Sequence, residues 1–216
     1  MSKVIVLMGI DGSGKSTLSR ALLAELQSRG IPAVARWATL RPVLMLPVIK
    51  LAKALLVRKV PKSVDYEAHI AAKRRGMKKL RFAHNLYFVM MTLDYLPQAW
   101  WKVGLPRLLG KHVICDRYVH DLALDFTITI NGDPNRMMRA LAVLERLVPR
   151  ADHHYFVAVP PEVALARKDD VPSVGYLQER DRFYRAMSKS LSLQVIDGTA
   201  EVPANCVRVL HDLNIP

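Results

Sequence analysis

Short apolar runs alternate along the chain with longer segments in which apolar residues recur at helical spacing. Five runs have the length and continuity of strands buried on both faces of a parallel sheet: residues 4–8, 31–36, 111–116, 153–159 and 193–197. After the first run, apolar residues recur every three or four positions from Leu18 to Leu26, which predicts a helix that stops at Gly30. This alternation predicts an α/β fold, a three-layer sandwich with a five-stranded parallel sheet flanked by helices.

Further helices are predicted over residues 42–58, 64–81, 82–101, 134–147 and 201–213. The first of them is amphipathic with a basic side. Such a helix either lies in a membrane interface or packs over the sheet with its lysines in solvent, and we favour the packed arrangement. The helix near 134 has the usual start, with Asp133 as N-cap and Pro134 in the first turn. We expect one domain over residues 1–216.

A glycine-rich segment, GIDGSGKST at residues 9–17, follows the first predicted strand and leads into the first predicted helix. It fits the phosphate-binding pattern G-x-x-x-x-G-K-[ST] in the structural context that this pattern requires. The glycines let the backbone approach an anion, Lys15 brings charge to the outer phosphates, and Ser16 offers a hydroxyl to Mg²⁺. We therefore predict that a nucleoside triphosphate binds to this segment. The predicted nucleotide-binding residues are Gly9, Asp11, Gly12, Ser13, Gly14, Lys15, Ser16 and Thr17.

The third predicted strand ends in Asp116, Arg117 and Tyr118. A carboxylate at this position, beside a phosphate-binding segment, holds the water shell of Mg²⁺ or orients the acceptor, and the adjacent arginine bridges oxygens of the transferred phosphate. Ser16 and Asp116 are thus the predicted metal-binding residues. Phosphoryl transfer depends mainly on positioning and charge neutralisation, so we expect His120 to be a surface or capping residue and not a base.

Residues for the acceptor are predicted at the end of the second strand, because ligands of open α/β sheets bind at the carboxyl ends of the strands. Trp37 either stacks on a ring of the acceptor or anchors its loop as a half-buried aromatic residue. Asp94 lies in the richly apolar segment 82–101, where a carboxylate needs a partner or a task. The predicted acceptor-binding residues are Asp11, Arg36, Trp37, Arg41, Asp94, Tyr118 and Asp121.

Residues 167–185 begin as a helix, break at a loop that contains proline and glycine, and resume as a helix rich in arginine. A loop flanked by arginines suits a lid over a triphosphate, because arginine binds phosphate oxygens in a fork and enters the site only when the lid closes. An ordinary helix–loop–helix with surface charges is the alternative, and we favour the lid.

Positive charge is concentrated in one third of the chain. Of the net charge of +13, twelve charges lie between Arg41 and Lys111, where 15 Lys and Arg face three acids. This basic region, 41–111, is either a solvated helical surface or a contact for an anionic surface such as nucleic acid or an acidic membrane. No uncharged apolar run approaches ~18 residues, and the two cysteines show no metal or disulfide spacing. We therefore expect a cytoplasmic protein without a transmembrane segment or signal peptide.

Five segments, in their order and spacing, resemble the thymidylate kinase family of P-loop nucleoside monophosphate kinases: GIDGSGKST, VICDRY, VPPEVALARK, LQERDRFYRAM and VIDG. The resemblance covers the first 30 residues and most of 108–213. It implies a helical acceptor-binding region at 37–107, a lid at 167–185, and transfer of the γ-phosphoryl group of ATP to a nucleoside monophosphate with Mg²⁺. It also makes a homodimer a reasonable expectation.

The resemblance gives several residues a role. Asp11 matches a position that meets the acceptor sugar in some members of the family. Arg167 resembles the arginine that packs on adenine at the start of the lid. The catalytic residues that the resemblance implies are Lys15, Asp116, Arg117, Arg180 and Arg182.

The middle third of the chain departs from the family pattern. An Arg-Glu-Pro-Gly segment is replaced by RWATLRP, Asp94 and Tyr95 stand where the family has an arginine, and HDLALD replaces the motif after DRY. These groups read thymidine monophosphate in the family. The acceptor is therefore a nucleoside monophosphate or, alternatively, a nucleoside, a sugar phosphate or another small alcohol. A nucleotide-switched module that binds nucleic acid or an acidic membrane through region 41–111 is the alternative outside the enzymes.

Overall fold

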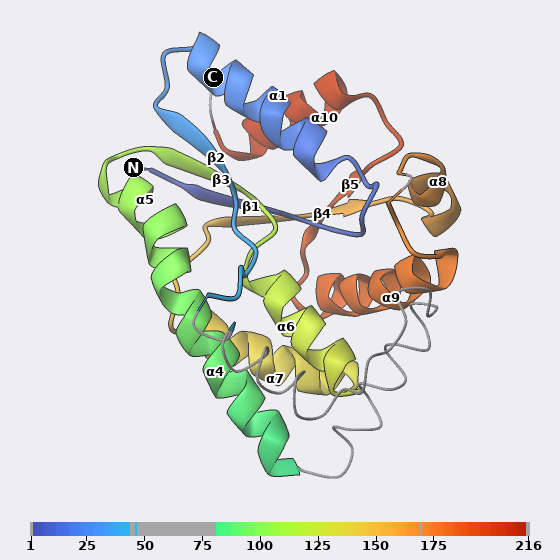
Figure 1. Ribbon diagram of the computed structural model, residues 1–216. Coiled ribbons are helices and arrows are strands. Elements are labelled where there is room, and N and C mark those ends of the chain that lie inside the picture. Colours follow the sequence, from blue (N-terminus) through green and yellow to red (C-terminus); the bar gives the residue numbers. More distant parts are fainter. Residues whose placement is uncertain (1, 44–45, 47–80, 169, 215–216) are drawn as a thin grey trace.

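The computed structural model of the chain describes residues 2–43, 46, 81–168 and 170–214 (Figure 1). Its centre is a five-stranded, all-parallel sheet in the order β2-β3-β1-β4-β5. The strands are β1 (Val4–Met8), β2 (Ala33–Trp37), β3 (His112–Asp116), β4 (His153–Ala158) and β5 (Gln194–Asp197). The five predicted strands and the α/β class are therefore confirmed, with each strand end within two residues of its predicted place.

Helices cover both faces of the sheet (Figure 1). Those described are α1 (Lys15–Ser28), α4 (Arg81–Ala99), the π-helix η1 (Trp100–Gly104), α5 (Leu105–Leu108), α6 (Val119–Thr129), α7 (Pro134–Glu145), α8 (Pro161–Ala166), α9 (Val174–Ser190) and α10 (Val202–Asp212). One face carries α1 and α10, and the other carries α4, α6, α7 and α9. Together with the sheet they form three layers. Within the described part of the chain, no helix is long and apolar enough to cross a membrane.

Strand β1 is buried on both sides and divides the core in two. Ile5 and Leu7 point to the face with α1, where they pack with Leu22. Val6 and Met8 point to the opposite face, and all of these side chains are fully buried. Successive side chains of a strand point to opposite faces, so a central strand with helices on both sides must be apolar at every position.

The connections around β1 create a crevice at one edge of the sheet. After β1 the chain enters α1 on one face, whereas after the neighbouring strand β3 it enters α6 on the other face (Figure 1). Leu7 and Asp116 are partners in the register, so both strands end at the same level. Parallel sheets bind ligands at such a switch point, outside the carboxyl ends of the strands.

The predicted helix at 82–101 is confirmed, but the helical path runs on to Leu108 through η1 and α5. Pro97 lies inside α4 and cannot donate a backbone hydrogen bond, and the wider π turn begins three residues later. The helix near 134 is also confirmed, since the Asp133 side chain accepts a hydrogen bond of 2.8 Å from the Arg136 N–H. Most of the two predicted helices at 42–58 and 64–81 lies outside the described residues.

The expectation that His120 is a surface or capping residue is wrong. Its side chain is fully buried in the first turn of α6, and the N-cap position of that helix belongs to Tyr118. Helix α6 is enclosed on nearly all sides, because it packs between the sheet and α7. Asp125 is the one exposed residue of α6, so His120 in the first turn has no solvent face to occupy.

Asp94 has a partner, as expected, and the partner is the backbone of the segment after β2. Its carboxylate is only 1 % exposed and accepts a hydrogen bond of 2.8 Å from the Val43 N–H. One turn further along α4, the Gln98 amide accepts from the Arg41 N–H at 3.1 Å and donates to the Arg41 carbonyl at 2.7 Å. Helix α4 thus holds the chain that leaves β2.

We predict that Asp94→Ala lowers the free energy of unfolding by about 1–3 kcal/mol, because the hydrogen bond between the buried Asp94 carboxylate and the Val43 N–H is lost. Urea unfolding measures this change. As a matched control, Asp170→Ala removes a carboxylate whose side chain is 74 % exposed and should stay within about 0.5 kcal/mol of the wild type. Equal stability of the two variants would contradict the anchoring role of Asp94.

Candidate functional site

A cavity of about 690 Å³ lies at the carboxyl edge of the sheet, and we call it the carboxyl-edge cavity. Its volume is within the range of small-molecule sites, about 300–1,000 Å³. The cavity gathers residues from the ends of β1, β2, β3 and β5 and from α1, α6 and α9. Its lining consists of Asp11, Gly12, Gly14, Lys15, Ser16, Thr17, Trp37, Thr39, Asp116, Arg117, Asp125, Arg167, Lys168, Tyr176, Arg180, Gly198, Ala200 and Val202.

The glycine-rich loop, residues 9–14, connects β1 to α1 along the floor of this cavity. Gly9, Gly12 and Gly14 have φ angles of 145°, 83° and 93°, which other residues adopt only with strain. At two of these glycines, neighbouring atoms also leave no room for a side chain. A Cβ added at Gly9 would lie 2.5 Å from the Val157 carbonyl oxygen, and one added at Gly12 would lie 2.3 Å from the Ala164 carbonyl oxygen. The loop is therefore held tightly against β4 and α8.

Gly14 is the N-cap of α1 and has no neighbouring atom where a Cβ would stand. No side chain caps the start of this helix. The first backbone N–H groups of a helix lack partners within it, and the helix dipole gives them a partial positive charge. The start of α1 thus presents donors to the carboxyl-edge cavity, in the arrangement that binds phosphates and other anions.

Lys15 follows directly and is almost fully buried. Its ammonium group donates hydrogen bonds to the Ile10 carbonyl at 2.6 Å and to the Ser13 hydroxyl at 3.1 Å, both within the glycine-rich loop. Burial, followed by the charge of Arg117, lowers the pKa of Lys15 to about 8, while Asp116 opposes the change. An anion in the cavity would favour the charged form of this lysine.

Ser16 and Asp116 join the start of α1 to the end of β3. The Ser16 hydroxyl donates a hydrogen bond to a carboxylate oxygen of Asp116, and both residues line the cavity. Hydroxyl and carboxylate oxygens are hard donors, and Mg²⁺ in nucleotide sites uses one or two such protein oxygens together with phosphates and water. These two residues fit a Mg²⁺ ion that is bound together with a phosphate chain.

Arg117 connects the two sides of the cavity. Its guanidinium forms ion pairs with Asp11 of the glycine-rich loop and, at 2.9 Å, with Asp121 of α6. Asp121 is 1 % exposed and also accepts a hydrogen bond of 2.6 Å from the Tyr184 hydroxyl of α9. Burial alone would lower the pKa of Arg117, but Asp121, Tyr184 and Asp11 outweigh it, so the pKa lies above its ordinary value and the group stays charged.

Helix α9 closes the other side of the cavity. Arg180 pairs with Asp125 of α6 at 2.6 Å and lies over the ring of Tyr176, 4.6 Å from its centroid. The Tyr176 hydroxyl in turn donates to Asp11 at 3.3 Å. Burial would raise the pKa of Asp11, but Arg117, followed by other cations, outweighs this and lowers it.

Five cationic side chains and three carboxylates face the cavity, so its lining is net positive. The cations are Lys15, Arg117, Arg167, Lys168 and Arg180, and the carboxylates are Asp11, Asp116 and Asp125. Basic groups that converge on the start of a helix favour an anionic ligand with several negative charges.

The structure brings together most of the predicted nucleotide and catalytic residues. Those that line the cavity are Asp11, Gly12, Gly14, Lys15, Ser16, Thr17, Asp116, Arg117, Arg167 and Arg180. Gly9 and Ser13 belong to the glycine-rich loop but do not line the cavity, and Ser13 is fully buried. Arg182 is not brought to this cavity: its guanidinium lies over the ring of Phe183, and it lines a separate pocket near Gly132.

Of the predicted acceptor residues, only Asp11 and Trp37 line the cavity. Arg41 lies over the ring of Trp37, 5.1 Å from its centroid, at the rim. Tyr118 is buried with its hydroxyl donating to the Pro149 carbonyl at 2.7 Å, away from the cavity. Asp121 does not line the cavity but forms an ion pair with Arg117, which does. Arg36 and Asp94 are not among the lining residues either.

Four polar residues of the cavity are not among the residues predicted from the sequence: Thr39, Asp125, Lys168 and Tyr176. The sequence spacing could have indicated two of them, Tyr176 and Asp125. Tyr176 precedes Arg180 by four positions and therefore lies on the same face of α9. Asp125 follows Asp121 by four positions on α6 in the same way. No comparable spacing indicates Lys168, which lies in the segment between α8 and α9 and is 3.9 Å from Asp11.

Comparison of the chain with protein-family models gave no match, and comparison with curated protein sequences gave no significant match. The geometry of the carboxyl-edge cavity is therefore the basis on which a function is proposed.

We predict that Gly12→Ala destabilises the protein more than Gly30→Ala. Both glycines have positive φ angles, 83° and 70°, but nothing lies within 4 Å of an added Cβ at Gly30. Gly30→Ala should therefore cost only the backbone strain of about 1–2 kcal/mol. Gly12→Ala must also displace the Ala164 carbonyl, at an additional ~1–3 kcal/mol. Urea unfolding of both variants measures the difference, and equal losses would show that the loop is not held against α8.

Proposed function

We propose that this protein is an ATP-dependent phosphotransferase, similar to thymidylate kinases, that transfers the γ-phosphoryl group to a nucleoside monophosphate. The observation that carries this proposal is the junction of β1, α1 and β3. A glycine-rich loop exposes the start of α1 there, and Lys15 and the Ser16–Asp116 pair lie at its edge. These are the parts that a phosphate chain with its metal ion requires.

In the proposed complex, the backbone N–H groups at the start of α1 hold the β- and γ-phosphates, and Lys15 neutralises part of their charge. The ammonium group of Lys15 then exchanges its hydrogen bonds within the loop for phosphate oxygens. Arg167, whose guanidinium donates to the Gly198 carbonyl at 2.8 Å, lies at the side of the cavity where it can pack on the base. This contact between the segment after β4 and the end of β5 closes that side.

Ser16 and Asp116 are the residues that would hold Mg²⁺ together with the phosphates. The ion would neutralise phosphate charge and align the phosphate chain for transfer. Asp116 lies at the end of β3, between the proposed donor and the acceptor, so its carboxylate can also orient the attacking oxygen.

Arg117 and Arg180 supply the remaining positive charge. Phosphoryl transfer proceeds through a loose transition state, in which positioning and charge stabilisation account for most of the catalysis. Arg117 is fixed by two carboxylates, so it needs no reorganisation when charge develops nearby. Arg180 pairs with the half-exposed Asp125, and its guanidinium would turn from this carboxylate to the phosphates when the nucleotide binds.

A second candidate is an ATP-dependent kinase of another acceptor, such as a nucleoside, a sugar phosphate or a small alcohol. The location of the predicted acceptor residues favours it. Asp94 is used to hold the backbone of Val43, and the Tyr118 hydroxyl is used by the Pro149 carbonyl. Trp37 and Thr39 are left as the side chains of the β2 end that face the cavity. An acceptor molecule with a ring that stacks on Trp37 suits both candidate functions.

The proposal is tested by turnover of the purified protein with ATP and Mg²⁺ against a panel of nucleoside monophosphates, nucleosides and phosphorylated sugars. We expect phosphate transfer to a monophosphate. Lys15→Ala should lower kcat/KM at least about a hundredfold, because it removes a charge that the transition state uses. Lys189→Ala, at the far end of α9, is the matched control and should keep the wild-type rate.

The outcomes separate the candidates. Transfer to a nucleoside or a sugar phosphate, but to no monophosphate, would support the second candidate. Turnover that Lys15→Ala leaves unchanged would overturn both, because neither can work without the charge at the start of α1.

A further inference from the structure

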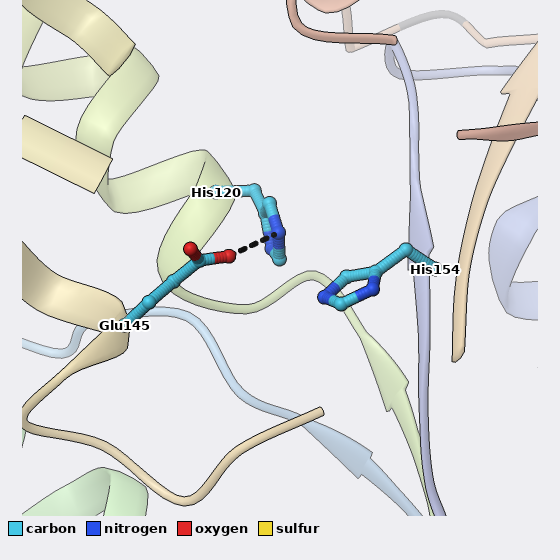
Figure 2. A group of neighbouring side chains, drawn as sticks. All are labelled: His120, Glu145 and His154. Carbon is cyan, nitrogen blue, oxygen red and sulfur yellow. Dashed lines mark ion pairs between the residues drawn. The ribbon is translucent and has the colours of Figure 1, made fainter. Parts of the chain in front are cut away.

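A second group of chemically active side chains lies away from the carboxyl-edge cavity. His120 comes from the first turn of α6, Glu145 from the last turn of α7 and His154 from the start of β4. Figure 2 shows the three side chains converging, with an ion pair between His120 and Glu145. We call them the His–Glu cluster. Because β4 begins at His153, the cluster lies toward the amino end of that strand, whereas the cavity lies at the carboxyl ends.

The donor atoms of the cluster are close enough to share one ion. One nitrogen from each imidazole and one oxygen of Glu145 all lie within 4.8 Å of one another. The His120 Nε2 to Glu145 Oε1 distance is 3.5 Å, which matches the separation of about 3.3–3.5 Å between two ligands of a tetrahedral Zn²⁺ ion. Small rotations of the His154 side chain would bring the third donor into the same shell.

The burial of His120 gives a second indication of a bound ion. Its side chain is fully buried, yet neither ring nitrogen forms a hydrogen bond among the described residues, and Nε2 has only the 3.5 Å contact with the Glu145 carboxylate. Leaving a buried polar atom without a partner costs about 1–3 kcal/mol, so such atoms are rare unless they serve a ligand, an ion or water. The ring of His154 stands edge-on to it, with the two centroids 5.0 Å apart.

The neighbourhood of the cluster leaves room for an ion and a further ligand. A cavity of about 520 Å³ is lined by all three side chains and also by Asp152. Asp152 is already engaged, since its carboxylate accepts from the Val4 N–H at 2.7 Å and pairs with Arg107 at 3.1 Å. Three ligands are thus available, and the remaining coordination position opens to the cavity and can take water.

We propose that His120, Glu145 and His154 bind one divalent transition-metal ion of the Zn²⁺ type. Two imidazoles with one carboxylate suit Zn²⁺ and similar ions, whereas Mg²⁺ prefers oxygen donors. The bound ion joins side chains of α6, α7 and β4. It also fixes the first turn of α6, where Asp121 follows His120 and holds Arg117. This second site is independent of the proposed kinase activity.

The test uses the full chain, with any affinity tag removed, and Co²⁺ as a spectroscopic probe in the presence of excess Mg²⁺. We expect one equivalent of Co²⁺ to give the visible absorption of a four- or five-coordinate site, and Zn²⁺ to displace it. Zn²⁺ at a hundredfold excess over its Kd should raise the melting temperature by about 5 °C, because it binds only the folded chain.

His154→Gln and Glu145→Gln should each weaken Co²⁺ and Zn²⁺ binding at least about a hundredfold, since loss of even an outer-shell partner costs ~10–100-fold. His153→Gln is the matched control: it removes the preceding histidine of β4, whose side chain points to the other face of the sheet. This control should bind as the wild type does. If His154→Gln fails to fold, Glu145→Gln decides, because its side chain is 39 % exposed.

Two results would overturn the proposal. One is a wild-type chain that binds neither Co²⁺ nor Zn²⁺ saturably, which would make the cluster a polar contact between helices and sheet. The other is metal binding that both ligand variants retain or that His153→Gln abolishes, which would place the ion elsewhere.

Discussion

The site depends on the ion pairs of the Arg117 guanidinium, whose side chain is largely buried at 16 % exposure. This guanidinium bridges Asp11 of the glycine-rich loop and Asp121 of α6, and Asp121 also binds the hydroxyl of Tyr184. Three segments from distant parts of the sequence are thereby fixed around the ends of β1 and β3. Removal of one partner of a buried ion pair costs about 3–5 kcal/mol, because the other charge is left without compensation. The backbone at Arg117 is left-handed, with φ at 69°, which turns its side chain back over the loop.

Helix α6 connects the two sites of the molecule. In its first turn, His120 contacts Glu145 in the His–Glu cluster, and the next residue, Asp121, pairs with Arg117 at the carboxyl-edge cavity. Further along the same helix, Asp125 pairs with Arg180 of α9. A metal ion bound to the cluster would therefore stabilise the element that positions the arginines of the proposed transferase, without contacting its substrates.

Sequence patterns predict this fold well where the cause is local. The strands follow from short apolar runs, and the glycine-rich loop follows from its spacing and from the strand and helix around it. The direction of a side chain depends on packing against remote parts of the chain, so sequence patterns predict it less well. The family resemblance gives Arg180 and Arg182 the same role, yet residues two apart in a helix point about 200° apart, so only one can face the cavity. Tyr118 is directed by the Pro149 carbonyl, in the segment between α7 and β4, and His120 lies against side chains of α7 and β4. Both contacts are remote in sequence.

The central claim is that the carboxyl-edge cavity binds the phosphates of a nucleotide at the start of α1. Amide chemical shifts, measured by NMR during titration with a non-hydrolysable ATP analogue and Mg²⁺, test it most directly. The account predicts saturable changes that are largest at Gly12, Gly14, Lys15 and Ser16 and that weaken when Mg²⁺ is removed. No change at these amides, or changes confined to other parts of the chain, would contradict it.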